Sequence, residues 1–156
     1  MVCTIVSGGS ELSPAIQNEN ASPYLEIKQR LREIIWELYC GGYDTFWLNC
    51  EYGVPLWAAE IICALKLYND IELNIAMPYE EQAARLCEEY RDRYFTVHSK
   101  SDRVVIVNTQ YHNGCYGEAD ETMTAEADLL AVFGEKGSCA FAESCAKKNK
   151  IKIMYF

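Results

Sequence analysis

The stretch TFWLNCEYGVPLWAAEIICALKLY, residues 45–68, decides the fold. Its first residues, Thr45 to Asn49, form a short apolar run that predicts a strand ending in the loop 50–53. Pro55 favours the first turn of a helix, which we expect to continue to about Tyr68. This helix is apolar on most of its faces, which indicates deep burial. A buried strand followed by a buried helix is the unit from which parallel sheets are built.

The same alternation continues in both directions along the chain. Each further predicted strand is a continuous apolar run, whereas the polar segment 11–21 resembles a loop. A helix is expected to start with Ser22 as the capping hydroxyl before Pro23 and to close at Gly41-Gly42. The other expected strands are 2–6, 71–77, 104–107, 129–133 and 151–155, and the other expected helices are 79–94, 118–127 and 140–148.

Strands without in/out alternation are covered on both faces. The sequence therefore predicts an α/β fold: a Rossmann-like three-layer sandwich whose mainly parallel sheet has about six strands and helices on both faces. Its crossovers should be right-handed. With 156 residues and no linker or repeat, the chain is expected to form a single domain, residues 1–156.

Composition and charge exclude several classes of protein. Fourteen basic and 23 acidic residues give a net charge of −9, which argues against duplex nucleic acid and anionic membranes as partners. No apolar window is long enough to span a membrane, and the first ten residues lack the basic start of a signal peptide. We therefore expect a cytoplasmic protein.

The eight cysteines have no CxxC pair, and the two histidines lie far from any repeated cysteine spacing. No metal site is predicted, and most cysteines are expected to be small buried residues of a reducing compartment. His112 and Cys115 are close in sequence, but we interpret this loop pair as incidental. Eleven tyrosines without interleaved Arg and Lys are weak evidence for nucleic-acid binding. The tryptophans are expected in the core or at a subunit contact: Trp36, Trp47 and Trp57.

In open α/β sheets the ligand lies at the carboxyl ends of the strands. Small residues follow two of the predicted strands, in the segments 7–10 and 134–138, where backbone N–H groups could face an anion. Neither segment has the GxGxxG or the P-loop pattern, so conventional dinucleotide or P-loop binding is not supported.

Several acidic residues are candidates for the site. Glu60 falls among apolar residues of its helix, so it is either an acid of the site or a hydrogen-bonded structural anchor. Glu143 is expected at the surface. We interpret the run Glu118-Ala-Asp120-Glu121 as a solvated helix N-terminus, with a hydroxyl- or cation-binding group at the pocket rim as the alternative.

Three blocks of the sequence resemble the SLOG superfamily, the Rossmann-like domains related to DprA and LOG, in its YpsA-like branch. The first is residues 47–62, in which Gly53-Val-Pro-Leu-Trp-Ala-Ala-Glu60 resembles that branch's Gly-Val-Asp-x-Trp-Ala-Ala-Glu, with Pro55 in place of the Asp. The second is Tyr111 to Met123 with 127–133, and the third is the turn Gly137-Ser-Cys-Ala140. The resemblance implies a Rossmann-like fold and a pocket for a nucleotide-derived ligand at the strand ends.

The chain departs from the family pattern where a phosphate would bind. The family's Thr-Gly-His-Arg-Pro loop is Ser7-Gly8-Gly9-Ser10 here, and its Arg-Asn pair is replaced by acidic residues around Asp120. Its Gly-Gly-Thr turn is reduced to 137–139. Each change removes a group that a phosphate would use.

From the residues and the resemblance together, we predict a sensor or regulatory domain that binds a nucleotide-derived or nucleoside ligand, without a cofactor. The predicted ligand-binding residues are Ser7, Gly8, Gly9, Asn49, Gly53, Glu60, Asn108, Gly134, Gly137 and Ser138. One alternative is a LOG-like N-glycosidic hydrolase in which Glu60 is the catalytic carboxylate. The other alternative is a degenerate interaction domain without a ligand. A homo-oligomer is expected.

Overall fold

The computed structural model describes residues 1–8, 18–84 and 86–156, and these residues form a six-stranded sheet. The strand order is β4-β3-β2-β1-β5-β6, and every neighbouring pair is parallel. The chain builds outward from β1 to β4 and then crosses to the other side of β1, so the order reverses between β1 and β5. The strands are β1 (Val2–Ser7), β2 (Thr45–Leu48), β3 (Glu72–Met77), β4 (Arg103–Ile106), β5 (Leu129–Phe133) and β6 (Lys152–Tyr155).

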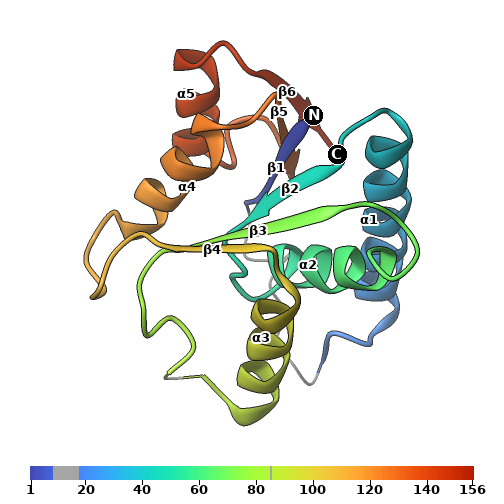
Figure 1. Cartoon of the computed structure of the whole chain (residues 1–156), viewed down its shortest axis with the longest axis vertical. Coiled ribbons are helices and arrows are strands. Elements are labelled where there is room, and N and C mark those ends of the chain that lie inside the picture. The colour runs from blue at the N-terminus through green and yellow to red at the C-terminus, as the bar shows by residue number, and fades with distance from the viewer. Residues whose placement is uncertain (9–17, 85) are drawn as a thin grey trace.

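Helices cover both faces of this sheet (Figure 1). One core packs the first three helices against the sheet, and a second, smaller core packs the last two against the opposite face. The helices of the first face are α1 (Ser22–Cys40), α2 (Val54–Leu65) and α3 (Glu88–Lys100), and those of the second are α4 (Cys115–Ala125) and α5 (Ala140–Lys148). The predicted three-layer α/β sandwich is confirmed.

The central strands are as buried as the sequence indicates. Every residue of β5 is buried, and both β5 and α5 have the predicted bounds. The two edge strands differ: the residues of β4 and β6 are exposed or half-buried. The expectation that every strand is covered on both faces is therefore wrong at the edges, where the five helices of the described chain leave the outermost strands partly uncovered.

The predicted helix 79–94 is confirmed only from Glu88 onward, and its first half is wrong. Residues 79–84 form turns instead, and α3 begins only at Glu88. Gln82 fixes the turn, because its Nε2 donates to the carbonyl of Asn49 (3.2 Å) while its Oε1 accepts from Tyr94 Oη (3.1 Å).

Two helix starts also differ from the prediction. Helix α1 already includes Ser22, whose hydroxyl bonds Glu26 (3.4 Å), so Ala21 rather than Ser22 is the cap. Helix α4 begins at Cys115, three residues before the predicted Glu118, after Gly114 in a left-handed conformation.

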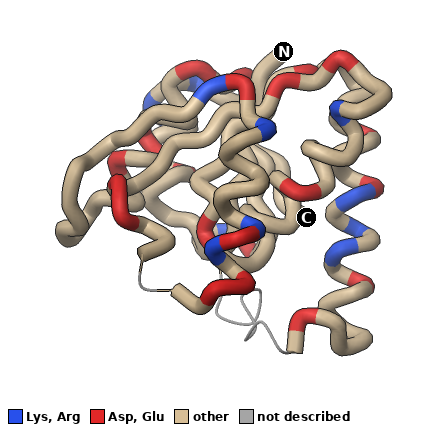
Figure 2. The backbone as a smooth tube through the Cα atoms, turned by 60° about the horizontal axis from the view of Figure 1, so that its bottom comes forward, with Lys and Arg blue, Asp and Glu red and all other residues tan. Residues whose placement is uncertain are grey.

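The charged residues are spread around the molecule, and both signs alternate along α1 (Figure 2). Among the described residues, no helix combines the length and the apolar character needed to cross a bilayer.

Candidate functional site

The site begins where the strand order reverses, because β1 and β5 are neighbours whose carboxyl ends lie side by side. The amide of Gly8 donates to the carbonyl of Phe133 (3.2 Å), which joins the loops that follow the two strands. A Cβ on Gly8 would lie 2.5 Å from the carbonyl oxygen of Ser138. A Cβ on Gly134, at φ +135°, would lie 2.8 Å from Ser138 Oγ. Only glycine permits this contact between the loops.

The structure thus brings together several of the predicted ligand-binding residues. Ser7 pairs with Phe133 at the ends of their strands, and Gly8, Gly134 and Ser138 are in mutual contact. Gly9, which was also predicted, lies outside the described residues, as do residues 11–17 of the predicted loop.

The side chain of Glu143 accepts hydrogen bonds from the backbone of the loop after β5. Its Oε1 accepts from the amides of Gly137 (2.8 Å) and Cys139 (3.4 Å), and Tyr155 Oη donates to its Oε2 (2.9 Å). Burial alone would raise the pKa of Glu143, but these hydrogen bonds outweigh it and the pKa is lowered. The predicted surface position is wrong: the residue is 2% exposed because it folds back over the first turn of α5.

Two carboxylates, Glu51 and Asp120, act electrostatically on each other and on Cys139 of this loop. Glu51 follows β2, and Asp120 lies on α4. Burial and then the charge of Glu51 raise the pKa of Asp120 to about 7, and burial also raises the pKa of Glu51. No described residue donates a hydrogen bond to either carboxylate. The interpretation of this run as solvated holds for Glu118 and Glu121, which are exposed, but not fully for Asp120, which is half-buried.

Two of the predicted ligand-binding residues, Asn49 and Asn108, form hydrogen bonds within the protein. Asn49 is buried, and its Oδ1 accepts from the amide of Glu51 (3.0 Å). Asn108 Nδ2 donates to the carbonyl of Pro78 (3.1 Å) and to Glu118 Oε2 (2.8 Å). Both residues therefore shape the loops at the carboxyl edge. Gly53, at φ 105°, is the residue at which the chain turns into α2.

A cleft of about 710 Å³ opens at the same edge, between the loops that follow β3 and β4. Its aromatic wall includes Tyr79 and Tyr111, whose ring centroids lie 5.4 Å apart in an edge-on arrangement. Tyr79 also contacts Tyr116 of α4 at 6.3 Å. Burial and then the charge of Glu51 raise the pKa of Tyr116, so this tyrosine lies near both Tyr79 of the cleft and Glu51. The remaining lining residues are Glu80, Glu81, Ala84, Thr109 and Gln110.

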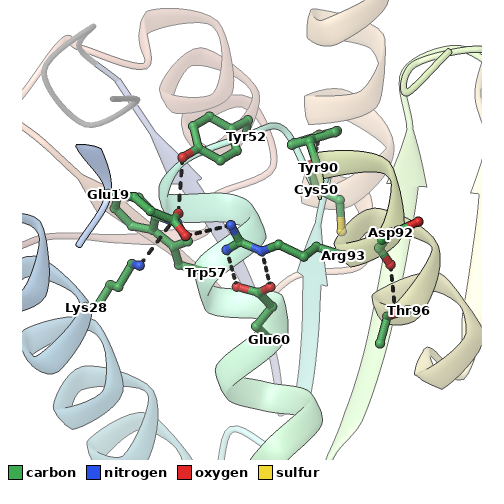
Figure 3. A network of polar contacts seen from close by, with 10 residues as sticks. All are labelled: Glu19, Lys28, Cys50, Tyr52, Trp57, Glu60, Tyr90, Asp92, Arg93 and Thr96. Carbon is green, nitrogen blue, oxygen red and sulfur yellow. Dashed lines mark hydrogen bonds and ion pairs between the residues drawn. The ribbon is translucent and has the colours of Figure 1, made fainter. Parts of the chain in front are cut away.

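Glu60, the candidate catalytic carboxylate, belongs to a separate network on the α1–α3 face (Figure 3). Arg93 of α3 donates from Nε and Nη2 to the two oxygens of Glu60, both at 2.7 Å, and from Nη1 to Glu19 Oε1, also at 2.7 Å. Both oxygens of Glu60 are therefore engaged by one guanidinium.

Glu19 is the centre of this network. Its Oε2 accepts from Trp57 Nε1 (2.8 Å) and from Tyr52 Oη (3.1 Å), and Lys28 Nζ lies 3.6 Å away. Burial alone would raise the pKa of Glu19, but the hydrogen bond from Trp57 and the charge of Arg93 outweigh it and lower the pKa. The network therefore ties the turn before α1 to α2 and α3.

The cysteines follow the prediction for most positions. Five of the eight are buried, whereas Cys40 and Cys87 are exposed and Cys139 is half-buried. No group of His, Cys, Asp and Glu within the described ranges could hold a metal ion. Trp47 and Trp57 lie in the core as expected, but Trp36 is 45% exposed.

The sequence analysis did not predict that Glu51, Asp120 and Glu143 lie near one another at the carboxyl edge. Glu51 directly follows a predicted strand, which is a signal for the carboxyl edge. Glu143 lies in the first turn of a helix after a glycine loop, where a carboxylate is favoured. The burial of Asp120 has no local signal, because it depends on where α4 packs.

Comparisons with known proteins agree with this architecture. A family model for YpsA, described as the YspA SLOG family, matches residues 4–155. UPF0398 proteins of Bacillus anthracis (strain A0248) and Bacillus thuringiensis (strain Al Hakam) are each 28% identical over 138 residues, which is 84% of this chain and 75% of theirs. The X-ray structure of TM1055, a Northeast Structural Genomics Consortium target, superposes with a TM-score of 0.61 over 97% of this chain and 71% of that one, at 14% identity. This last likeness concerns the fold.

Proposed function

The chain belongs to the YspA SLOG family, and from that premise we propose that it is a sensor or regulatory domain that binds a small nucleoside or nucleotide-derived ligand. The ligand would lie at the carboxyl edge of the sheet, between the glycine loops and the tyrosine-lined cleft. This is the position at which open α/β sheets bind ligands.

The observation that carries the proposal is the pair formed by Glu51 and Asp120. Asp120 is half-buried and Glu51 is exposed beside it, and no described residue donates a hydrogen bond to either carboxylate. A half-buried carboxylate such as Asp120 loses part of its hydration, so a ligand that donates hydrogen bonds to it binds favourably. Sugar hydroxyls are such donors, and a carboxylate that accepts from ribose is a recurrent feature of Rossmann-like folds.

The adjacent tyrosines suit the other half of such a ligand. Tyr79 and Tyr111 line the cleft, and Tyr116 connects it to the acidic pair. Aromatic rings stack on nucleobases with about 1–3 kcal/mol per base, whatever the base is. A nucleoside could therefore place its sugar on the carboxylates and its base against the tyrosines.

Titration calorimetry with the common nucleosides and their mono- and dinucleotides tests this function. We expect binding by the wild-type protein and about tenfold weaker binding by Asp120→Asn, because the amide loses one of the acceptors. Asp70→Asn, which changes an exposed carboxylate after α2, should bind as the wild type does. If none of these compounds binds the wild-type protein, the proposed function is wrong.

One observation favours hydrolysis as a second candidate function. Asp120, whose pKa burial and the nearby Glu51 raise to about 7, is suited to donate a proton near neutral pH. Two carboxyl groups with different proton affinities are the arrangement with which glycosidic bonds are broken. Asp120 would give its proton to the leaving base, and the C1′–N bond would break. Water would add its hydroxyl to C1′, and its remaining proton would return to Asp120. Glu51 would stabilise the positive charge that develops on the sugar.

Chromatography of free base released from nucleosides and nucleoside monophosphates tests this second function. Asp120→Asn should abolish release, and the wild-type rate should fall as the pH rises through about 7. Glu60→Gln should retain the rate per folded molecule, because both oxygens of Glu60 are held by Arg93. Equal release by wild type and Asp120→Asn would remove this role for Asp120.

The sensor function is proposed for a cytoplasmic homo-oligomer. The exposed indole of Trp36 supports the subunit contact, since a large exposed aromatic side chain is favoured at interfaces. Light scattering on the wild type and on Trp36→Lys measures the assembly. A monomeric wild type at micromolar concentration would contradict it.

A further inference from the structure

Five backbone amides that the structure describes at the reversal point, where a phosphate of a Rossmann-like ligand would bind, are already engaged by the protein. In the loop after β5, Gly137 and Cys139 donate to Glu143, and Ser138 donates to the carbonyl of Glu135 (3.0 Å). The neighbouring amides of Gly8 and Gly134 donate to the carbonyls of Phe133 (3.2 Å) and Phe156 (3.1 Å). An incoming anion therefore finds none of these five N–H groups free.

The acceptor that Glu143 supplies is itself an anion. Its carboxylate binds two backbone amides and one hydroxyl, which is the coordination that a phosphate takes from a loop before a helix. It is almost completely covered, so it is held in place rather than exchanging with solvent. A phosphate that entered would have to displace this carboxylate or lie beside its charge, and both are unfavourable.

The surrounding charge acts in the same direction. Glu51 and Asp120 lie next to this loop, and the charges of Asp120, Glu143 and Glu51 all act on Cys139 within it. The site therefore combines an occupied anion position with further negative charge.

We infer that Glu143 is a specificity-determining residue: its carboxylate occupies the phosphate position of the fold and restricts the site to ligands that carry no phosphate there, such as nucleosides. This inference rests on the proposed function for the identity of the ligand. The occupied anion position itself can be tested without that ligand.

Inorganic phosphate is the direct probe, with thermal unfolding at constant ionic strength as the measurement. The wild-type protein should show the same unfolding temperature in phosphate and in chloride. Glu143→Ala removes the carboxylate and frees the amides of Gly137 and Cys139, so its unfolding temperature should rise with phosphate concentration. Glu135→Ala is the matched control: this exposed side chain lies in the same loop, but only its backbone accepts from Ser138, so it should behave as the wild type.

A third variant distinguishes two effects of Glu143: its occupation of the loop amides and its negative charge. Glu143→Gln keeps an acceptor for the two amides, so it should remain folded and gain less phosphate stabilisation than Glu143→Ala. If the wild-type protein is stabilised by phosphate as strongly as Glu143→Ala, or if neither Glu143 variant responds while both are folded by circular dichroism, the inference is wrong.

Nucleoside selectivity completes the test. The wild-type protein should bind a nucleoside at least about tenfold more tightly than its 5′-monophosphate, and Glu143→Ala should reduce this preference by about tenfold. If nucleosides fail to bind while Glu143→Ala still gains phosphate binding, the proposed function fails and the occupied anion position stands. Tighter binding of the monophosphate by the wild type overturns the inference alone.

Discussion

Replacing Arg93 by Met should lower the free energy of unfolding by more than the loss of any exposed ion pair does. The substitution removes hydrogen bonds of 2.7 Å to Glu60 and Glu19 and leaves the two carboxylates without their guanidinium. Breaking a buried pair in this way costs about 3–5 kcal/mol. The Glu60 side chain is 34% exposed and that of Glu19 only 9%, so water compensates the first carboxylate in part. We expect a loss of about 3 kcal/mol in the free energy of unfolding.

Urea denaturation followed by far-UV circular dichroism measures this loss. Circular dichroism is preferred to tryptophan fluorescence, because Trp57 belongs to the same network and its emission would respond to the local change. In thermal unfolding the same loss corresponds to a decrease of about 9 °C for a chain of this size. Arg30→Met is the control: its pair with Glu33 on α1 is exposed on both sides, and such pairs contribute at most about 1 kcal/mol.

The pH dependence gives a second readout of the same network. The pKa of Glu19 is lower in the folded state than in the unfolded state, so its contribution is present above the unfolded value and is lost as the pH falls through the folded one. The difference between wild type and Arg93→Met should therefore narrow in acid. A difference below about 0.5 kcal/mol at pH 7, or one that does not change between pH 7 and pH 3, would refute the assignment of this network as a structural anchor.

Three further predictions follow from the site. Gly134→Ala should destabilise the protein by more than Gly137→Ala in urea denaturation, because both glycines have positive φ but only the first has atoms within 4 Å of a new Cβ; equal losses would contradict the close contact. Asp120→Asn should stabilise the protein by about 2 kcal/mol at pH 8 and by nothing at pH 3. The folded pKa of Asp120 is raised to about 7, so the wild-type protein loses stability as the pH rises above the unfolded pKa of this residue, and the variant does not. A difference that stays constant with pH would exclude this cause. Iodoacetamide mapped by mass spectrometry should label Cys40 and Cys87 first in the native protein, because these thiols are exposed; faster labelling of a buried cysteine would contradict the described packing.

The sequence was sufficient for the fold because that part of the structure depends on local patterns. The fully buried strand Leu129–Phe133 and the helix Ala140–Lys148 have the predicted bounds, since each lies between clear turn signals. The segment 79–94 failed for the opposite reason. Its turn depends on Gln82, whose partners Asn49 and Tyr94 are 33 and 12 residues away, so no window of the sequence contains the interaction.

The carboxylates show why the site was harder to predict than the fold. A helical wheel identifies the face on which Glu60 or Glu143 lies, but not the residue that it meets. Glu60 meets Arg93, 33 residues later, and becomes an anchor, whereas Glu143 meets Tyr155 and the amides of its own loop and becomes part of the site. The role of Glu60 is therefore set by a distant tertiary contact, whereas that of Glu143 combines bonds within its own loop with one to β6.

Part of the net charge of −9 is concentrated at the carboxyl edge of the sheet. A surplus of acidic residues on a surface mainly affects solubility and the approach of partners. Here three of them, Glu51, Asp120 and Glu143, converge on the edge where related folds bind ligands, and one of them binds the loop amides directly. At that position a carboxylate favours ligands without a phosphate, because it raises the free energy of a bound phosphate while sugar hydroxyls still find acceptors. The acidic composition is therefore, in part, a property of the site.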